Sequence, residues 1–445
     1  MLGGKCKLYW KKFMNIINSL VVGRKLKRNL FLALTIVLSW QQMKANAQAV
    51  DSLDIKIGQM ILIGFAKPDI DSAVLKEIRS GKAGSLLIFE KNIPAKSSFA
   101  SLKKIIWTYQ KAAPIPLIVA IDQEGGRVNR LKEKYGFTRS ITAQAMGKSP
   151  SLDSVQFYAD ATAATLAGLG INLNFAPVVD LGSNPDNPII AKVGRAFSSR
   201  EDSVTLLAKE FIKQHRKYNV LTSLKHFPGH GSSKADTHLG MADVTATWEE
   251  RELKPYKDLI DSGYVDAIMS AHIVNKKLDS IGNPGTLSKA ILTGILRQRL
   301  HFNGVIFSDD MQMHAITKHY GFEEAVKLAI QGGVDIMIFS NNISGSDVRT
   351  VDKVHAIIRS LVDRGIISPA RIDESFRRVM RLKKQIVAPE KTATLKKSLN
   401  QKDVEIATLK QQLAEKEAEV SKLKSVQESE KESTSKKKRK KKNKK

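Results

Sequence analysis

The sequence predicts a (β/α)8 TIM-type barrel, an α/β fold that forms a single catalytic domain. Three observations predict it. Eight short apolar runs recur between residues 59 and 340, longer helical or loop stretches separate them, and polar side chains lie near the ends of most runs. Near-continuous apolar runs are typical of parallel strands that are buried on both faces. Strand–helix alternation repeated in this way fits a closed barrel, and a doubly wound sheet is the alternative.

The candidate strands follow one another in a regular order along the chain. They are QMILIGF (59–65), SLLIFE (85–90), LIVAID (117–122), NLNFAPVVD (172–180), TSLKHF (222–227), AIMSAH (267–272), GVIFSD (304–309) and DIMIFS (335–340). Helical patterns lie between them, for example over 203–218 and 322–331. A barrel brings the carboxyl ends of its strands together at the face where active sites are found, which a doubly wound sheet would not do for so many ends. The polar residues near these ends are Asp122, Asp180, His226, His272, Asp309 and Ser340.

The first 47 residues are typical of an export signal. A basic stretch over 24–28 precedes an apolar run over 30–40, and Ala45-Asn46-Ala47 follows it. These are the three parts of a cleavable signal peptide, with cleavage expected near Ala47. We therefore expect an exported protein, with the periplasm as its preferred location. The only cysteine, Cys6, lies in this segment, so the barrel predicted over 48–388 is expected to form neither a disulfide nor a zinc–thiolate site.

Two further segments follow the predicted barrel. Residues 389–427 carry apolar residues at heptad spacing, although two lysines interrupt one seam, which predicts a coiled coil that could self-associate through 395–427. A lone helix is the alternative. Residues 428–445 are rich in charge and serine, which indicates a disordered polybasic tail. Its last ten residues, 436–445, would suit contact with an anionic polymer or a membrane surface, and a merely solvated tail is the alternative.

The net charge of +28 is concentrated in the two ends of the chain. Residues 1–47 contribute +9 and residues 436–445 another +9, which leaves +10 for everything between them. The barrel itself is therefore only moderately basic. For this reason we expect no specific nucleic-acid partner from the charge.

The segment KHFPGHGSSKADTH (225–238) is the richest in chemical groups. Its proline and glycines exclude a helix, so we expect the end of a strand that runs into a loop. Asp236 and His238 are two residues apart, so in an extended loop their side chains point to the same side. A carboxylate beside an imidazole raises its basicity and makes it a proton carrier near neutral pH.

A glycosidase needs one group that attacks or stabilises the anomeric carbon and another that carries a proton to the leaving oxygen. The seventh run offers Asp309 or Asp310 for the first role, and the Asp236–His238 pair offers the second. Because neighbouring strand residues point to opposite faces, only one of the two aspartates is expected to face the barrel mouth directly. A sugar pocket between these groups would use Asp122 as an acceptor and Arg130, Arg195, Lys225 and His226 as donors.

Four motifs in this order resemble those of family 3 glycoside hydrolases, specifically the bacterial β-N-acetylhexosaminidase branch. The motifs are IDQEGGRVNRL (121–131), NFAPVVD (174–180), KHFPGHG with D-T-H (225–238) and GVIFSDDM (304–311), and the likeness runs from about Ile57 to Leu382. The resemblance implies a retaining exo-β-N-acetylhexosaminidase that releases terminal β-linked N-acetylglucosamine from glycans or peptidoglycan fragments. It implies Asp309 as nucleophile and His238 as general acid/base with Asp236 as its partner. No metal or cofactor is expected. The residues that match the N-acetylglucosamine-binding positions are Asp122, Arg130, Arg195, Lys225 and His226.

Several alternatives stay open from the sequence. A neutral imidazole as acid/base does not repel an incoming anion, so a phosphorylase that uses phosphate in place of water is one alternative, and a β-glucosidase or arabinofuranosidase of the same family is another. His226, His230, Asp236 and His238 suggest a metal-dependent hydrolase, but Pro228 and Gly229 exclude the helical geometry of a His-x-x-x-His pair. A non-enzymatic barrel anchored to the envelope is the last alternative. Only the heptad segment follows the barrel, so no second domain is expected to supply an acid/base carboxylate.

Overall fold

The computed structural model describes residues 53–235, 240–344, 348 and 350–386. The predicted signal peptide, coiled coil and basic tail therefore lie outside the described residues, as do Asp236 and His238. Within the described part of the chain, no helix combines the length and apolar character needed to cross a membrane.

Eight parallel strands close into a barrel, which confirms the fold predicted from the sequence. Each strand lies within or overlaps one of the eight predicted runs, and β10 pairs with β1 to close the ring, with Ile61 opposite Met337. A doubly wound sheet is thereby excluded. The barrel strands are β1 (Ile61–Gly64), β2 (Ser85–Ile88), β3 (Ile118–Ile121), β4 (Leu173–Asn174), β5 (Leu221–Phe227), β7 (Ala267–Ser270), β9 (Val305–Asp310) and β10 (Ile336–Phe339).

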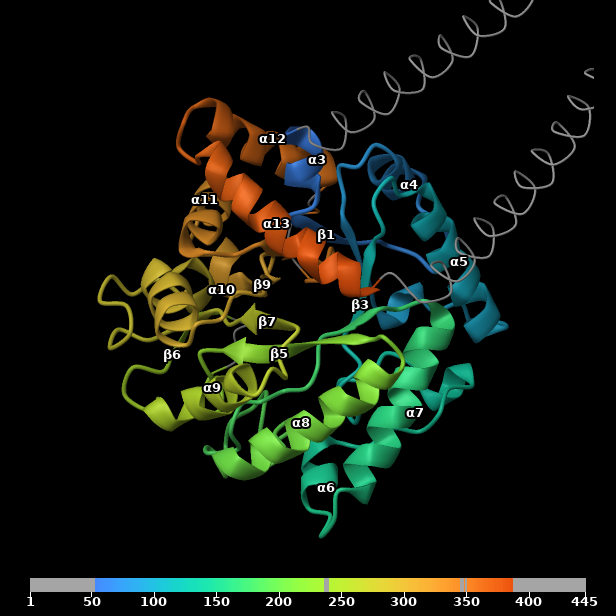
Figure 1. Cartoon of the computed structure of the whole chain (residues 1–445), viewed down its shortest axis with the longest axis vertical. Coiled ribbons are helices and arrows are strands. Elements are labelled where there is room, and N and C mark those ends of the chain that lie inside the picture. Colours follow the sequence, from blue (N-terminus) through green and yellow to red (C-terminus); the bar gives the residue numbers. More distant parts are fainter. Residues whose placement is uncertain (1–52, 236–239, 345–347, 349, 387–445) are drawn as a thin grey trace, which may run out of the picture. The chain divides into compact units, whose positions relative to one another are not determined.

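Helices surround the barrel and connect one strand with the next (Figure 1). The α-helices are α3 (Leu53–Gly58), α4 (Ser72–Arg79), α5 (Ser98–Ala112), α6 (Ala143–Gly147), α7 (Asp153–Leu169), α8 (Glu201–Lys217), α9 (Lys254–Asp261), α10 (His314–Thr317), α11 (Phe322–Gly332), α12 (Val351–Asp363) and α13 (Pro369–Ile386). A π-helix, η5 (Ala290–Arg299), precedes β9, and short 3-10 turns are η1 (Glu90–Asn92), η2 (Glu133–Tyr135), η3 (Glu250–Leu253) and η4 (Gly285–Leu287). The helical patterns predicted over 203–218 and 322–331 correspond to α8 and α11.

Alternation along the strands divides the apolar side chains between two packed regions. In β1, Leu62 belongs to the cluster inside the barrel, whereas Ile61 and Ile63 belong to the cluster between the barrel and the helices. This alternation follows from the strand geometry, in which successive side chains point to opposite faces. Both faces are buried, which explains why the sequence shows continuous apolar runs rather than an apolar–polar pattern.

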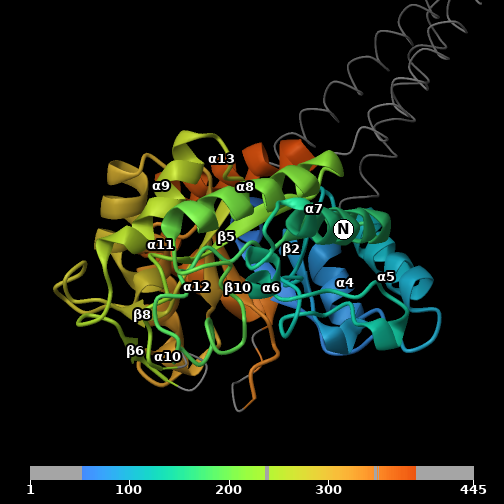
Figure 2. The same ribbon diagram turned by 90° about the horizontal axis from the view of Figure 1, so that it is seen from below.

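Helix α13 closes the amino-terminal end of the barrel. Its Val379, Leu382 and Ile386 pack with the apolar side chains of the barrel interior. The Lys383 ammonium donates to Gln59 Oε1 at 2.6 Å and to the Gly84 carbonyl at 2.7 Å, just before β1 and β2. Figure 2 shows α13 at one end of the barrel and the loops that carry α10, β6 and β8 at the other. The opposite, carboxyl-terminal end is therefore the open one.

Strand β4 is much shorter than the predicted run over 172–180, since only Leu173 and Asn174 pair as a strand. Pro177 has no N–H to donate and interrupts the ladder, which resumes at a single parallel bridge between Val178 and Lys225. The Asn174 side chain extends the pairing instead: its Oδ1 accepts from the Gln123 N–H at 3.0 Å, and its Nδ2 donates to the Gln123 carbonyl at 3.1 Å. The end of β3 and the chain after β4 therefore stay in register above the barrel.

Two strands outside the barrel pair with each other near its open end. They are β6 (Ala242–Asp243) and β8 (Ile273–Val274), with Ala242 opposite Ile273. The sequence analysis did not predict this pair. It fixes the segment that returns from the loop after β5 beside the chain that leaves β7.

Candidate active site

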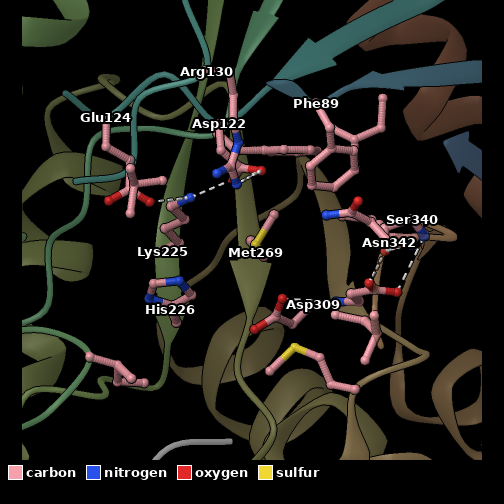
Figure 3. Close-up of a pocket in the computed structure, with 18 of the residues that line it drawn as sticks. Phe89, Asp122, Glu124, Arg130, Lys225, His226, Met269, Asp309, Ser340 and Asn342 are labelled. Atoms are coloured by element: carbon pink, nitrogen blue, oxygen red, sulfur yellow. Dashed lines mark hydrogen bonds and ion pairs between the residues drawn. The ribbon is translucent and has the colours of Figure 1, made fainter. Parts of the chain in front are cut away.

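A pocket of about 330 Å³ lies at the carboxyl-terminal ends of the barrel strands (Figure 3). Polar side chains from β3, β5, β9 and their following loops face one another across it, as expected for the functional face of a barrel. Apolar side chains from the barrel interior, among them Phe175 and Met269, also contribute to its lining. The charged and histidine residues that line it are Asp122, Glu124, Arg130, Arg195, Lys225, His226, His230, Asp309 and Asp310.

Lys225 is a buried cation held between two carboxylates. Its side chain is 2% exposed, and its Nζ lies 2.7 Å from Asp122 Oδ1 and 2.6 Å from Glu124 Oε1. Burying an ammonium is costly unless it is paired, and the two short contacts provide that pairing. Burial alone would raise the pKa of Asp122, but the charges of Lys225 and Arg130 outweigh it and hold the pKa below its usual value. Asp122 is therefore a charged acceptor at the pocket wall.

Two arginines complete this charged wall. Arg195 makes a bidentate pair with Glu124, with Nε and Nη2 each 2.7 Å from a carboxylate oxygen. Arg130 Nη2 lies 3.4 Å from Asp122 Oδ2, and its guanidinium lies 5.3 Å from the centre of the Phe89 ring. Burial raises the pKa of Glu124, but the stronger opposing effect of Arg195 and Lys225 holds it well below its usual range. The carboxylates and cations of the wall thus stay charged and fix one another in place.

His226 is oriented by a second buried carboxylate. Its Nδ1 lies 2.6 Å from Asp180 Oδ2, and its Nε2 lies 3.2 Å from Arg195 Nη2. An arginine can only donate, so Nε2 accepts and the ring proton lies on Nδ1, directed at Asp180. The other oxygen of Asp180 accepts from the backbone N–H groups of His226 and His230. The peptide bond between Lys225 and His226 is cis, and both side chains line the pocket.

The two aspartates at the end of β9 have different surroundings. Asp310 is 8% exposed, and its carboxylate accepts from the Ser340 hydroxyl and from the backbone N–H groups of Gln312 and Ser340. Burial, with a contribution from Asp309, raises the pKa of Asp310 to about 6. Asp309 is less buried, lines the pocket, and accepts from the Asp310 N–H at 2.8 Å. Both aspartates line the pocket, but Asp310 is tied into the barrel, so Asp309 is the better placed to meet a ligand.

The structure brings six of the eight predicted site residues to one pocket: Asp122, Arg130, Arg195, Lys225, His226 and Asp309. Asp236 and His238 lie outside the described residues, so their position stays a prediction. Glu124 was missed in the sequence analysis. Its signal was available, since it lies two residues after Asp122 and so extends the same face of the chain leaving β3. His230 also lines the pocket, and burial lowers the pKa of its ring to about 4.

Among the described residues, no three potential metal ligands are grouped as a metal site would require. The described wall offers recognition of hydroxyl and amide groups by charged donors and acceptors, together with the partly exposed carboxylate of Asp309 at the end of β9. These are the binding groups and one of the two reacting groups that a sugar-cleaving site needs.

Residues 52–382 match the sequence profile of the glycosyl hydrolase family 3 N terminal domain. The chain belongs to this family. Among its relatives, a beta-hexosaminidase from Tolumonas auensis is 34% identical over 283 residues, which cover 62% of this chain and 81% of that protein. The resemblance predicted from four motifs is thereby confirmed.

Two solved structures superpose on most of this chain. A β-N-acetylglucosaminidase from Paenibacillus sp. str. FPU-7 superposes with a TM-score of 0.69 at 30% identity, covering 75% of this chain and 62% of that one. The chain thus spans less than two thirds of that protein. A beta-N-acetylhexosaminidase from Beutenbergia cavernae superposes with a TM-score of 0.66 at 27% identity, over 75% of this chain and 98% of that one.

Proposed function

We propose that this family 3 glycoside hydrolase is a retaining exo-β-N-acetylhexosaminidase that removes terminal β-linked N-acetylglucosamine from glycans or peptidoglycan fragments. The observation that carries the proposal is the arrangement of the pocket. The Asp309 carboxylate at the end of β9 lies across one cavity from Asp122, Arg130 and Lys225 (Figure 3), and Arg195 and His226 line the same cavity. The names of its relatives support the choice of the 2-acetamido sugar.

In the proposed first step, an oxygen of Asp309 attacks the anomeric carbon as the bond to the leaving oxygen breaks. The transition state resembles an oxocarbenium ion, whose positive charge the Asp309 carboxylate stabilises. Formation of the bond between the Asp309 oxygen and the anomeric carbon then gives a covalent glycosyl-enzyme. His238, with Asp236 as its partner, gives a proton to the leaving oxygen. In the second step the same imidazole takes a proton from water, which attacks the anomeric carbon and frees Asp309. Two displacements leave the anomeric configuration unchanged.

The charged wall binds the sugar in this scheme. Asp122, as a charged carboxylate, accepts from sugar hydroxyls, while Arg130, Arg195 and Lys225 donate to hydroxyl and amide oxygens. Because these groups already pair with one another, they are oriented before the substrate arrives, and little ordering is required on binding. The His226 Nδ1 proton is directed at Asp180, which fixes the plane in which the ring meets a ligand.

Hydrolysis of 4-nitrophenyl β-glycosides of N-acetylglucosamine and glucose tests the proposal with wild type, Asp309→Ala and His238→Ala. We expect wild type to hydrolyse the acetamido sugar faster than the glucoside. Asp309→Ala should abolish this hydrolysis, and His238→Ala should strongly reduce it. Proton NMR of the first sugar released should show the β-anomer, and added phosphate should yield no sugar phosphate. Full activity of Asp309→Ala would rule out its role as nucleophile, and a sugar phosphate product would favour the phosphorylase.

We also propose, from the N-terminal and C-terminal sequences alone, that the protein is exported to the periplasm and that 395–427 mediates self-association. Fractionation of the producing cells tests the first proposal, and sedimentation of the full chain beside a variant ending at residue 388 tests the second. Recovery of the protein in the cytoplasmic fraction would contradict the first proposal. Sedimentation of both the full chain and the shortened variant as monomers would contradict the second.

A further inference from the structure

His272 lies near a strand end, as predicted from the sequence, and the proposed reaction does not use it. It follows β7 by two residues, and its side chain is buried. Its Nε2 lies 2.9 Å from the backbone carbonyl oxygen of Asp310. A carbonyl oxygen can only accept, so Nε2 carries the ring proton and donates it. The ring therefore binds the backbone directly after Asp309, the nucleophile of the proposed reaction.

The end of β9 is irregular at Asp309. On its β10 side, Phe307 pairs with Ile336. The next pair joins Asp310 with Ile338, so two residues of β9 stand opposite one residue of β10. This is a β-bulge, which breaks the alternation of side chains along a strand and can redirect one of them. The bulge explains why Asp309 and Asp310 both line the pocket although they are neighbours on one strand.

Side chains replace part of the backbone pairing around this bulge. On the β10 side, the Ser308 hydroxyl accepts from the Ile338 N–H at 2.9 Å, where a regular ladder would supply a backbone carbonyl. On the β7 side, the Ser270 hydroxyl donates at 3.2 Å to the carbonyl that precedes the bulge, and His272 donates to the carbonyl that follows it. A bulge disrupts the ladder, so these bonds satisfy backbone groups that would otherwise lack a partner.

Asp310 links these bonds to the nucleophile. Its N–H donates to Asp309 Oδ1 at 2.8 Å, which orients that carboxylate. Its own carboxylate accepts from the Ser340 hydroxyl and the Gln312 N–H, and its carbonyl accepts from His272. Asp310 is therefore held at both its side chain and its carbonyl, and the N–H of the same residue is fixed with them. Attack on an anomeric carbon requires close approach in one direction, so this orientation matters for the rate.

We propose that His272 is a positioning residue for the nucleophile: by holding the Asp310 carbonyl at the bulge it keeps the Asp310 N–H directed at the Asp309 carboxylate. The inference rests on the proposed function, in which Asp309 attacks the anomeric carbon. His272 is not among the described residues that line the pocket, so it acts through the backbone and not on the sugar. Its loss should slow the attack and leave the charged wall around Lys225 intact.

The test measures the first displacement with 2,4-dinitrophenyl N-acetyl-β-glucosaminide. This leaving group departs without a proton, so kcat/KM reports the attack of Asp309 independently of the acid/base. We expect His272→Leu to lower kcat/KM about 10- to 100-fold, since a shift of about 1 Å in a reacting group costs up to about 100-fold. The inhibition constant of free N-acetylglucosamine should stay within about twofold of wild type, because the wall still binds the sugar. His272→Gln keeps an N–H donor near the position of Nε2 and should stay within about threefold of wild type.

Rates are expressed per active site, which separates slow attack from a smaller folded fraction. A 5-fluoro N-acetylglucosaminyl fluoride provides the count: Asp309 displaces the anomeric fluoride, and the glycosyl-enzyme that accumulates is detected by intact-mass spectrometry. The matched control is His355→Leu. The His355 ring on α12 is also buried, and its Nε2 donates to the Asp54 carbonyl at 3.0 Å, outside the barrel. This variant should lose stability and keep its rate per active site.

Three results would overturn the positioning role: a rate per active site near wild type in His272→Leu, an equal loss in His272→Gln, or a weakened inhibition constant. If His272→Leu does not fold, His272→Asn replaces it, because the shorter amide does not reach the Asp310 carbonyl. If Asp309→Ala kept full activity on the same substrate, the proposed function would fail instead.

Discussion

Replacing Glu124 by glutamine tests how the charged wall of the pocket is held together. Glutamine keeps the size of the side chain and one acceptor oxygen but removes the charge. Glu124 receives three short contacts: two from Arg195 at 2.7 Å and one from the Lys225 ammonium at 2.6 Å. Its side chain is 4% exposed and those of Arg195 and Lys225 are 11% and 2% exposed, so water does little to screen the charges.

The cost follows from this geometry. Asp122, Glu124 and Asp180 balance Arg130, Arg195 and Lys225, so Glu124→Gln leaves one positive charge uncompensated in a buried cluster. Removing one partner of a buried ion pair typically costs about 3–5 kcal/mol. For a domain of this size such a loss lowers the melting temperature by roughly 4–7 °C. Sugar binding should weaken as well, because Arg195 and Lys225 lose the group that orients them.

Chemical denaturation of wild type and Glu124→Gln measures the difference in unfolding free energy, with Glu210→Gln as the control. Glu210 pairs with Lys213, whose side chain is 46% exposed, so the control should lose only about 1 kcal/mol. The pKa of Glu124 is held far below the unfolded value of 4.5, so its contribution is fully present above pH 4.5 and is lost as the pH falls below it. A difference below about 1 kcal/mol that does not change with pH would refute the reasoning.

Three further predictions concern other parts of the barrel. Gly229→Ala should lower the unfolding free energy by about 2–4 kcal/mol, because its φ is +116° and its Cβ would lie 2.6 Å from Glu252 Oε2; denaturation measures this, and an unchanged value would contradict it. Burial raises the pKa of Asp310 to about 6, and Ser340→Ala removes a hydrogen-bond donor to this carboxylate. The pKa of Asp310 should therefore rise further, as measured by NMR titration of labelled aspartate. A lower pKa in the variant would exclude the donor role. Burial lowers the pKa of Lys383 to about 7, so the folded state loses this proton before the unfolded state does. The stability of wild type relative to Lys383→Met should therefore rise by about 1.4 kcal/mol per pH unit between pH 7 and 10, and a flat difference would show that Lys383 is not desolvated.

The strands were predictable because burial on both faces leaves a mark in the local sequence. Runs such as LIVAID and DIMIFS contain almost nothing but apolar residues, and a polar residue at the end of a run marks the place where the strand leaves the core. Local reasoning overestimated β4, where Pro177 interrupts the ladder before the bridge at Val178 and the Asn174 side chain pairs with the end of β3. That substitution of side chain for backbone is a contact between distant segments, which a single run cannot reveal.

The residues of the site were predictable from the sequence, whereas the contacts between them were not. The sequence alone determined the residue types at the strand ends, and closure of an eight-strand barrel then makes those ends converge, so Asp122, Lys225 and Asp309 could be placed in one pocket before the structure was known. Only the tertiary structure decided which of them pair. The 2.6 Å contact between Lys225 and Glu124 and the bond from His272 to the Asp310 carbonyl join residues far apart in the chain. A shift of a few tenths of an ångström is enough to weaken such contacts, so they depend on the packing of whole elements. The period of a strand depends only on its own backbone.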